Sequence, residues 1–211
     1  MMALKKDHKL YEIWDHHWRN ADSAERHTVV GRMMFRSKQD AIGRLLGQIK
    51  VDRVIDVGCG RGHILQIYHD AELKCLGIDV SAHAVAACVD KGLPAVVKKL
   101  EDETGSYDLV SNDGMLEHFL NFAPYARHLM RISRRYVLLL QPNHQSFAGG
   151  TLNWLANLLR RDKLVYEYNY RIADFVELFG DNGFRLIENR PLLMDVARLL
   201  LFEKRPLPIN R

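Results

Sequence analysis

Short apolar runs alternate with amphipathic segments through the middle of this chain. Five runs have the length of a strand and are mostly apolar: RVIDV (53–57), KCLGIDV (74–80), PAVVK (94–98), YDLVS (107–111) and YVLLLQ (136–141). Such runs are typical of strands that are buried on both faces of a sheet. Helical patterns separate most of them, at residues 62–71, 81–92 and 122–132. The alternation predicts an α/β fold with a doubly wound, mainly parallel sheet.

The two ends of the chain follow other patterns. Residues 10–48 have helical spacing, with Tyr11, Trp14 and Trp18 on one face, and predict a helical cap. Near the other end, a helix over 172–183 precedes FRLIENR (184–190) and ARLLLFEKR (197–205), which predict an antiparallel strand pair. The sheet would then have seven strands, one of them antiparallel. We expect one domain with four parts: a cap (1–48), a core (51–143), an insertion (144–171) and a C-terminal helix and strand pair (172–205).

Charge and hydropathy narrow the range of partners. The formal net charge is +4, and the basic residues occur in small groups, so we expect no nucleic-acid partner. No apolar run approaches the roughly 20 residues that cross a bilayer, and the first residues lack a signal core. We therefore expect a cytoplasmic protein with reduced thiols at Cys59, Cys75 and Cys88. Alternatively, an amphipathic helix in TLNWLANLLRR (151–161) lies on a membrane surface.

The loop after the first predicted strand carries the clearest ligand signal. From Gly58 its spacing is G-x-G-x-G, which lacks the third glycine of the dinucleotide pattern G-x-G-x-x-G. Asp56 lies directly before the loop, where a carboxylate repels a phosphate and attracts a cation. Asp79 ends the second strand, within reach of ribose hydroxyls in a doubly wound sheet. A ligand with a ribose, no phosphate and a positive amino group meets these requirements, as S-adenosylmethionine does.

Five segments in order then resemble the class I S-adenosylmethionine-dependent methyltransferases. These are VIDVGCGRGHIL, CLGIDVS, SYDLVSNDGMLEHF, YVLLLQPN and LFGDNGFRLIE, which together extend over about residues 51–202. The resemblance implies a Rossmann-like fold that closes with a reversed strand. It also implies S-adenosylmethionine as cofactor and methyl transfer to an oxygen or nitrogen of a small-molecule acceptor.

The resemblance also assigns residues to the cofactor. Gly58, Cys59 and Gly60 would line its methionine part, with Asp56 facing the amino group. Cys59 is interpreted as a small buried residue between glycines rather than as a nucleophile. Asp79 would hold the ribose hydroxyls, the alternative being a cap for the following helix.

The adenine and the methyl donor have further candidate neighbours. Val80 would lie beside the adenine, together with Leu100. Because the loop after the third strand departs from the family pattern, the contact to the adenine amino group falls to Glu101, to its neighbour Asp102 or to neither. The pair Asn112 and Asp113 would face the methyl donor at the end of the fourth strand. The segment lacks the prolines and the aromatic residue of enzymes that methylate base amino groups, which argues against a nucleic-acid base as acceptor.

Glu117 and His118 form an acid–imidazole pair near the predicted site. Methyl transfer mainly requires an aligned acceptor, and an oxygen acceptor must also lose a proton, which His118 can take as general base. In the alternative interpretation, Glu117 and His118 only start a helix and His118 packs against the cofactor loop. We expect no metal, because no second acid–histidine pair accompanies Glu117.

Two further alternatives stay open. Trp14, Trp18 and the leucine face of 152–159 form either a lid that excludes water or plain core. The protein is either a methyltransferase, or a cofactor-binding accessory subunit that acts through a partner, because some segments also resemble the methionine-biosynthesis MetW-type proteins. A different transferase of the same fold, such as an aminopropyl transferase, is disfavoured, because few acids follow the fourth strand.

Overall fold

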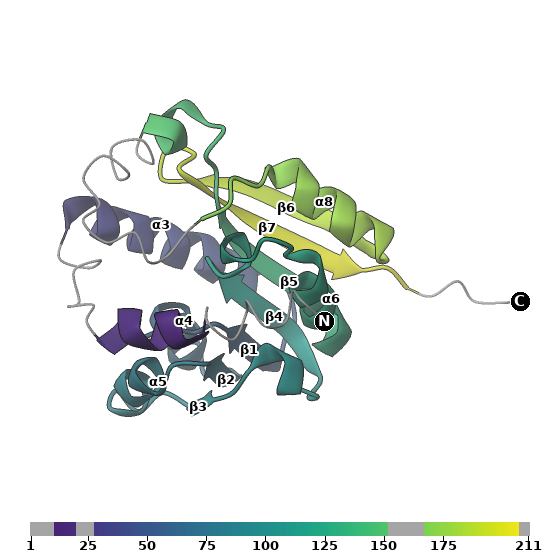
Figure 1. Ribbon diagram of the computed structural model, residues 1–211. Coiled ribbons are helices and arrows are strands. Elements are labelled where there is room, and N and C mark those ends of the chain that lie inside the picture. Colours follow the sequence, from purple (N-terminus) through teal and green to yellow (C-terminus); the bar gives the residue numbers. More distant parts are fainter. Residues whose placement is uncertain (1–10, 20–27, 152–166, 207–211) are drawn as a thin grey trace, which may run out of the picture.

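The computed structural model describes residues 11–19, 28–151 and 167–206, and a seven-stranded sheet forms its centre (Figure 1). The strand order is β3-β2-β1-β4-β5-β7-β6. The strands are β1 (Arg53–Val57), β2 (Lys74–Asp79), β3 (Ala95–Val97), β4 (Tyr107–Asp113), β5 (Ser133–Pro142), β6 (Phe184–Leu192) and β7 (Ala197–Lys204). Strand β7 runs antiparallel to both of its neighbours, and the other adjacent pairs are parallel. The predicted mainly parallel sheet with one reversed strand is confirmed.

Helices cover both faces of the sheet, as expected for a doubly wound fold (Figure 1). A hydrophobic cluster joins α3 (Val29–Leu46) and α4 (His63–Asp70) to one face, and α5 (Ala82–Val89) packs beside α4. A second cluster joins α6 (Ala123–Ile132) and α8 (Ile172–Asp181) to the other face. Two short 3₁₀ turns, η1 (Leu100–Asp102) and η2 (Leu116–His118), follow β3 and β4.

The apolar runs are continuous because the strands are buried on both sides. In β5, Leu138 packs into the cluster with α3 and α4, while its neighbours Val137 and Leu139 pack into the cluster with α6 and α8. Successive side chains of a strand point to opposite faces. Each strand residue therefore contributes to one of two cores, and alternation with polar residues is absent from this run.

The strand order places a ligand site at β1. The chain passes from β1 outward to β2 and β3, and then returns to the other side of β1 as β4. Ligands in open α/β sheets bind at such a switch point, beyond the carboxyl ends of the strands. The loops after β1, β2 and β4 meet there, and these loops together with the ends of the three strands carry most of the predicted site residues.

The cap differs in detail from the expected helical region over 10–48. The structure has a separate N-terminal helix at residues 11–19 and then α3, which begins after Thr28. The Thr28 side chain caps α3, because its Oγ1 accepts a hydrogen bond from the Gly31 amide at 3.0 Å. Residues 20–27 and most of the amphipathic helix predicted over 151–161 lie outside the described residues.

Candidate active site

A cavity of about 530 Å³ lies at the carboxyl ends of β1, β2 and β4. This volume falls within the roughly 300–1,000 Å³ of small-molecule sites. Its walls come from the loop after β1, the end of β2, the η1 and η2 turns, Lys38 of α3, Glu167 and the N-terminal helix. The sheet and the two helical layers therefore all contribute residues to one cavity.

The glycine loop closes one wall of the cavity. Gly58 and Gly60 have φ angles of +70° and +50°, a conformation that favours glycine. The amides of Gly58 and Cys59 donate to the Ile78 carbonyl at 2.8 and 3.1 Å, which fixes the loop to β2. A Cβ added at Gly60 would lie 2.8 Å from the Trp18 ring. The loop thus brings bare backbone to the surface of the cavity.

Cys59 packs into the loop rather than presenting a reactive thiol. It is buried, and a Cβ added at Gly77 on β2 would lie 2.8 Å from its sulfur. A hydrogen bond that the Cys59 thiol donates to Cys88, together with burial, raises the pKa of the Cys59 thiol. A thiol with a raised pKa is a poor nucleophile.

Asp79 organises the loop from the end of β2. Its Oδ2 accepts the Gly60 amide at 2.9 Å and its Oδ1 accepts the Ser81 amide at 2.9 Å. The side chain is buried, and burial raises its pKa. The cap role is taken by Ser81 itself, whose Oγ accepts from the Ala84 amide. Asp79 therefore lines the cavity with a carboxylate held in place by two backbone donors.

Asp56 lies deeper, at the end of β1. It is 2% exposed, and its Oδ1 accepts a hydrogen bond from Ser111 Oγ at 2.8 Å. Burial raises the pKa of Asp56 to about 8, and the Ser111 hydrogen bond opposes this shift. A buried carboxyl in this state is stabilised as its anion when a positive group approaches it. Asp56 lines the cavity, where such a group can bind.

The residues predicted to contact the adenine differ in whether they line the cavity. Val80 and Leu100 line the cavity. Glu101 and Asp102 belong to η1 but do not line it, and Glu101 Oε1 accepts a hydrogen bond from Tyr11 Oη at 2.7 Å. Glu101 thus connects η1 to the N-terminal helix, a contact that the sequence pattern did not predict.

The end of β4 also separates two predicted neighbours. Asn112 is fully buried, and its Nδ2 donates to the Val57 carbonyl at 2.8 Å, which ties β4 to β1. It does not line the cavity, whereas Asp113 does. Both oxygens of Asp113 accept from Lys38 Nζ at 2.7 Å. Lys38 comes from α3, so its role depends on tertiary packing that the sequence pattern does not reveal.

Glu117 and His118 lie together in η2, both buried and both at the cavity. Among the described residues, Glu117 Oε2 has no hydrogen-bond partner. Burial raises the pKa of Glu117 to about 8, with repulsion from Glu167 and Asp113 adding to the shift. The His118 ring meets Trp14 edge-on, with centroids 4.7 Å apart. His118 is thus placed both to reach the cavity and to pack against the cap.

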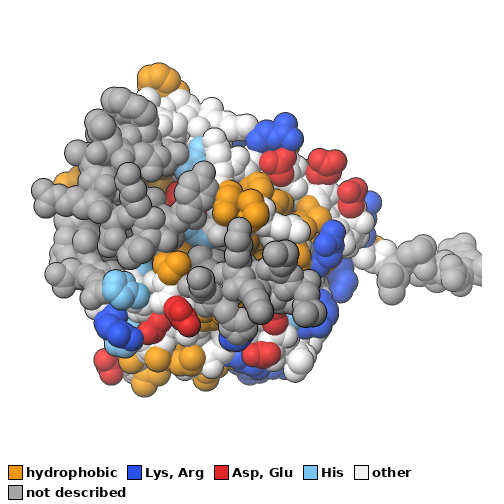
Figure 2. Space-filling view, in the orientation of Figure 1, with side chains coloured by type: hydrophobic (Ala, Val, Ile, Leu, Met, Phe, Trp, Pro, Cys, Tyr) orange, Lys and Arg blue, Asp and Glu red, His pale blue; other side chains and the backbone are white. Residues whose placement is uncertain are grey.

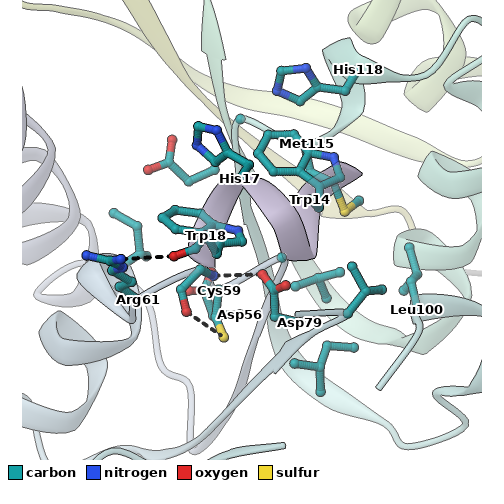
Figure 3. A pocket seen from close by; sticks show the side chains of 18 of the residues that line it. Trp14, His17, Trp18, Asp56, Cys59, Arg61, Asp79, Leu100, Met115 and His118 are labelled. Carbon is teal, nitrogen blue, oxygen red and sulfur yellow. Dashed lines mark hydrogen bonds between the residues drawn. The ribbon is translucent and has the colours of Figure 1, made fainter. Parts of the chain in front are cut away.

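The N-terminal helix forms the roof of the cavity (Figure 3). Arg61 of the glycine loop donates to the Trp18 carbonyl at 3.0 Å, and Ser81 Oγ donates to Asp15 at 2.8 Å. Figure 3 shows Asp56, Cys59 and Asp79 at one end of this roof and His118 at the other. The aromatic residues of this helix therefore cover the site.

Three further features of the described residues are the distribution of surface charge, the length of the apolar helices and the arrangement of possible metal ligands. In Figure 2, basic and acidic side chains are intermixed on the visible described surface. No helix in the described ranges is long and apolar enough to cross a membrane. Within the same ranges, no group of three or more His, Cys, Asp and Glu residues is arranged to hold a metal ion.

Comparisons with known proteins extend these observations. A magnesium protoporphyrin IX methyltransferase from Synechocystis with bound S-adenosylhomocysteine has a TM-score of 0.67 and 19% identity, over 93% of this chain and 94% of that one. A Thermotoga maritima S-adenosylmethionine-dependent methyltransferase, described as a possible histamine N-methyltransferase, has a TM-score of 0.71 and 14% identity, over 92% and 100%. At these identities the similarity establishes a shared fold. No curated protein matches the chain.

A family model decides the assignment. The model described as a methyltransferase domain matches residues 30–189, which is most of the chain. The matched range contains the glycine loop, Asp79 and the η2 turn. The chain belongs to this methyltransferase domain family and is a class I S-adenosylmethionine-dependent methyltransferase.

Proposed function

We propose that the cavity binds S-adenosylmethionine at the glycine loop and a small-molecule acceptor at η2, and that the protein methylates an oxygen or nitrogen of that acceptor. The observation that carries the proposal is the pair of buried carboxyls, Asp56 and Asp79, beside glycine backbone in one cavity. A positive amino group and a ribose are the complementary chemical groups. The cavity continues to an acid and an imidazole at η2, where an acceptor has room.

The donor end is assigned residue by residue. Asp56 binds the amino group, because within the described residues its buried carboxyl accepts a side-chain hydrogen bond from Ser111 and has no cationic partner. Asp79 accepts from the ribose hydroxyls, and its two backbone donors hold it in position. Val80 and Leu100 flank the adenine with apolar surface.

The donor supplies a methyl group on a sulfonium: the acceptor lone pair forms the new bond as the carbon–sulfur bond breaks, and the sulfur keeps that electron pair. The protein's own contribution is alignment and exclusion of water. The roof, with Trp18 beside Gly60 and Trp14 against His118, limits water along the cavity. For an oxygen acceptor, His118 takes the hydroxyl proton as general base.

Calorimetric titration with S-adenosylhomocysteine tests the donor site. We expect micromolar binding to the wild-type protein and at least a hundredfold weaker binding to Asp79→Ala, because the ribose and the loop both lose their carboxylate. Asp181→Ala, at the end of α8 and exposed, is the matched control and should bind normally. Equal affinity of all three proteins would contradict the proposed site.

A further inference from the structure

The acceptor end of the cavity has a charge pattern of its own. Asp113, Glu117 and Glu167 line it together with Lys38. The Tyr168 amide donates to the Glu117 carbonyl at 2.7 Å, which fixes the segment that begins at Glu167 beside η2. Two carboxyls from the end of β4 and η2 and a third from the distant Glu167 are therefore gathered at one end of the cavity.

Lys38 is directed at one of these carboxyls. Its Nζ lies 2.7 Å from both oxygens of Asp113, and both side chains are mostly buried. Glu167 has its own neighbour, since its Oε2 lies 3.8 Å from Nε2 of the buried His144. Glu117 is thus left facing two acids, Glu167 and Asp113, with Lys38 as the opposing charge.

Glu117 itself has an unmet hydrogen-bonding need. It is 5% exposed, and within the described ranges its Oε2 has no donor. A buried carboxyl oxygen without a donor is costly, and buried polar groups are nearly always satisfied. Because Glu117 lines the cavity, a ligand can supply the missing donor.

We propose that the acceptor is an amine, bound as its ammonium ion against Glu117 and deprotonated by it. This inference rests on the proposed function and names the acceptor class. An ammonium ion provides N–H donors and offsets the negative charge of the three carboxyls. An anionic acceptor would add a further negative charge beside Glu117, and a neutral hydroxyl would leave the charge uncompensated.

The proton transfer balances without a further reactant. An ammonium nitrogen has no lone pair, so it cannot attack a methyl group. Glu117 accepts the proton, the N–H electron pair stays on nitrogen, and the neutral amine becomes the nucleophile. After release of the methylated amine, Glu117 returns the proton to solvent. Burial raises the pKa of Glu117 to about 8, which brings it closer to that of an alkylammonium than an ordinary carboxyl would be.

Two series of probe compounds test the acceptor class; within each series the compounds have a similar carbon skeleton and differ in the functional group. Calorimetry on the protein saturated with S-adenosylhomocysteine compares 2-phenylethylamine with 2-phenylethanol and 3-phenylpropanoate, and hexylamine with hexanol and hexanoate. We expect each amine to bind at least tenfold more tightly than its alcohol and its acid. Amine affinity should also rise between pH 6 and 8, as Glu117 becomes ionised. A preference for either acid or alcohol, or no binding by any probe, would overturn the proposal.

Variants locate the preference at this carboxyl. Glu117→Gln keeps the shape of the side chain and loses the charge, so it should remove the amine preference and the rise with pH. Glu167→Gln should reduce the preference several-fold and serves as the test if Glu117→Gln does not fold. Glu177→Gln, exposed on α8, should leave both properties unchanged. An undiminished amine preference in Glu117→Gln and Glu167→Gln would overturn the proposal.

The same measurements separate this inference from the proposed function. If S-adenosylhomocysteine does not bind the wild-type protein, the methyltransferase site itself is misplaced. If it binds and the amines show no preference, the donor site stands and only the acceptor class is wrong.

Discussion

The donor end and the acceptor end of the cavity are built in different ways. At the donor end, amides of the glycine loop donate hydrogen bonds to the Asp79 side chain and to the Ile78 carbonyl at the end of β2. At the acceptor end, Lys38, Glu117 and Glu167 come from three distant segments and meet only through tertiary packing. The donor end is therefore held by contacts between neighbouring strands and their loops, whereas the acceptor end is assembled by elements far apart in the sequence.

The largest effect is expected from substitutions of one carboxyl at each end, which should change catalysis and cofactor binding separately. Glu117→Gln should lower kcat/KM for an amine acceptor about a hundredfold and change S-adenosylhomocysteine affinity less than twofold. Asp56→Asn should instead weaken S-adenosylhomocysteine roughly thirtyfold, because its amino group loses a buried counter-charge. Steady-state kinetics and calorimetry on both variants check this. If each variant impaired both properties equally, the cavity would have no such division.

The dependence of stability on pH also compares the two ends, because each holds a buried carboxyl, Asp56 or Glu117, whose pKa is raised to about 8. Burial raises the pKa of both Asp56 and Glu117 to about 8, well above their values in the unfolded chain. Their contribution to stability is full below about pH 4 and is lost as pH rises toward 8, since the unfolded chain releases the protons first.

The ligand-free protein should therefore lose stability between pH 5 and 8. Urea unfolding at pH 5 and pH 8 measures this loss. At pH 8 the free energy of unfolding of Asp56→Asn should exceed that of the wild type by about 2 kcal/mol. Saturating S-adenosylhomocysteine should cancel the Asp56 part of this loss and leave the Glu117 part. A pH-independent wild type would contradict the burial of these charges.

A smaller effect is expected at the glycine loop. Gly60→Ala should weaken S-adenosylhomocysteine about tenfold, because Gly60 has a positive φ and an added Cβ would meet Trp18. Adding Trp18→Ala removes the contact with the ring but not the backbone strain, so it should recover only part of the affinity. Full recovery in the double variant would assign the whole effect to the roof.

The smallest expected effect concerns the charge that Lys38 provides. Lys38→Met should destabilise the protein by about 1–2 kcal/mol, since Asp113 loses a partly buried partner. The pKa of Glu117 should rise further, because Lys38 lowers it. Urea unfolding and the pH profile for amine binding measure these two effects, and Lys74→Met, which breaks an exposed ion pair, is the control. Equal effects of the two variants would show that Lys38 contributes no more than a lysine in an exposed ion pair.

The residues proposed for the donor end can be selected from the sequence for a physical reason. Strands that are buried on both faces leave continuous apolar runs, and the loops that follow them hold their ligand residues at fixed offsets. The sequence pattern alone therefore places Asp56, Gly58, Gly60 and Asp79 at one site, and all four line the cavity. The placement of Val80 and Leu100 follows from the same geometry.

The acceptor end is less accessible to prediction from sequence. Lys38 occurs in a helical pattern with nothing to mark it as a cavity residue, and Glu167 lies in a segment predicted only as an insertion. Asn112 and Glu101 carry suitable chemistry at suitable offsets, yet one ties β4 to β1 and the other meets Tyr11. Local pattern gives the position of a residue along a strand or loop, and tertiary packing decides which atoms reach the cavity.

A crystal structure of the protein with S-adenosylhomocysteine tests the central claim most directly. We expect the ribose hydroxyls within hydrogen-bond distance of Asp79, the amino group at Asp56 and the sulfur directed toward Glu117 and His118. A nucleoside bound elsewhere, or a sulfur directed away from η2, would contradict the division of the cavity into a donor and an acceptor end.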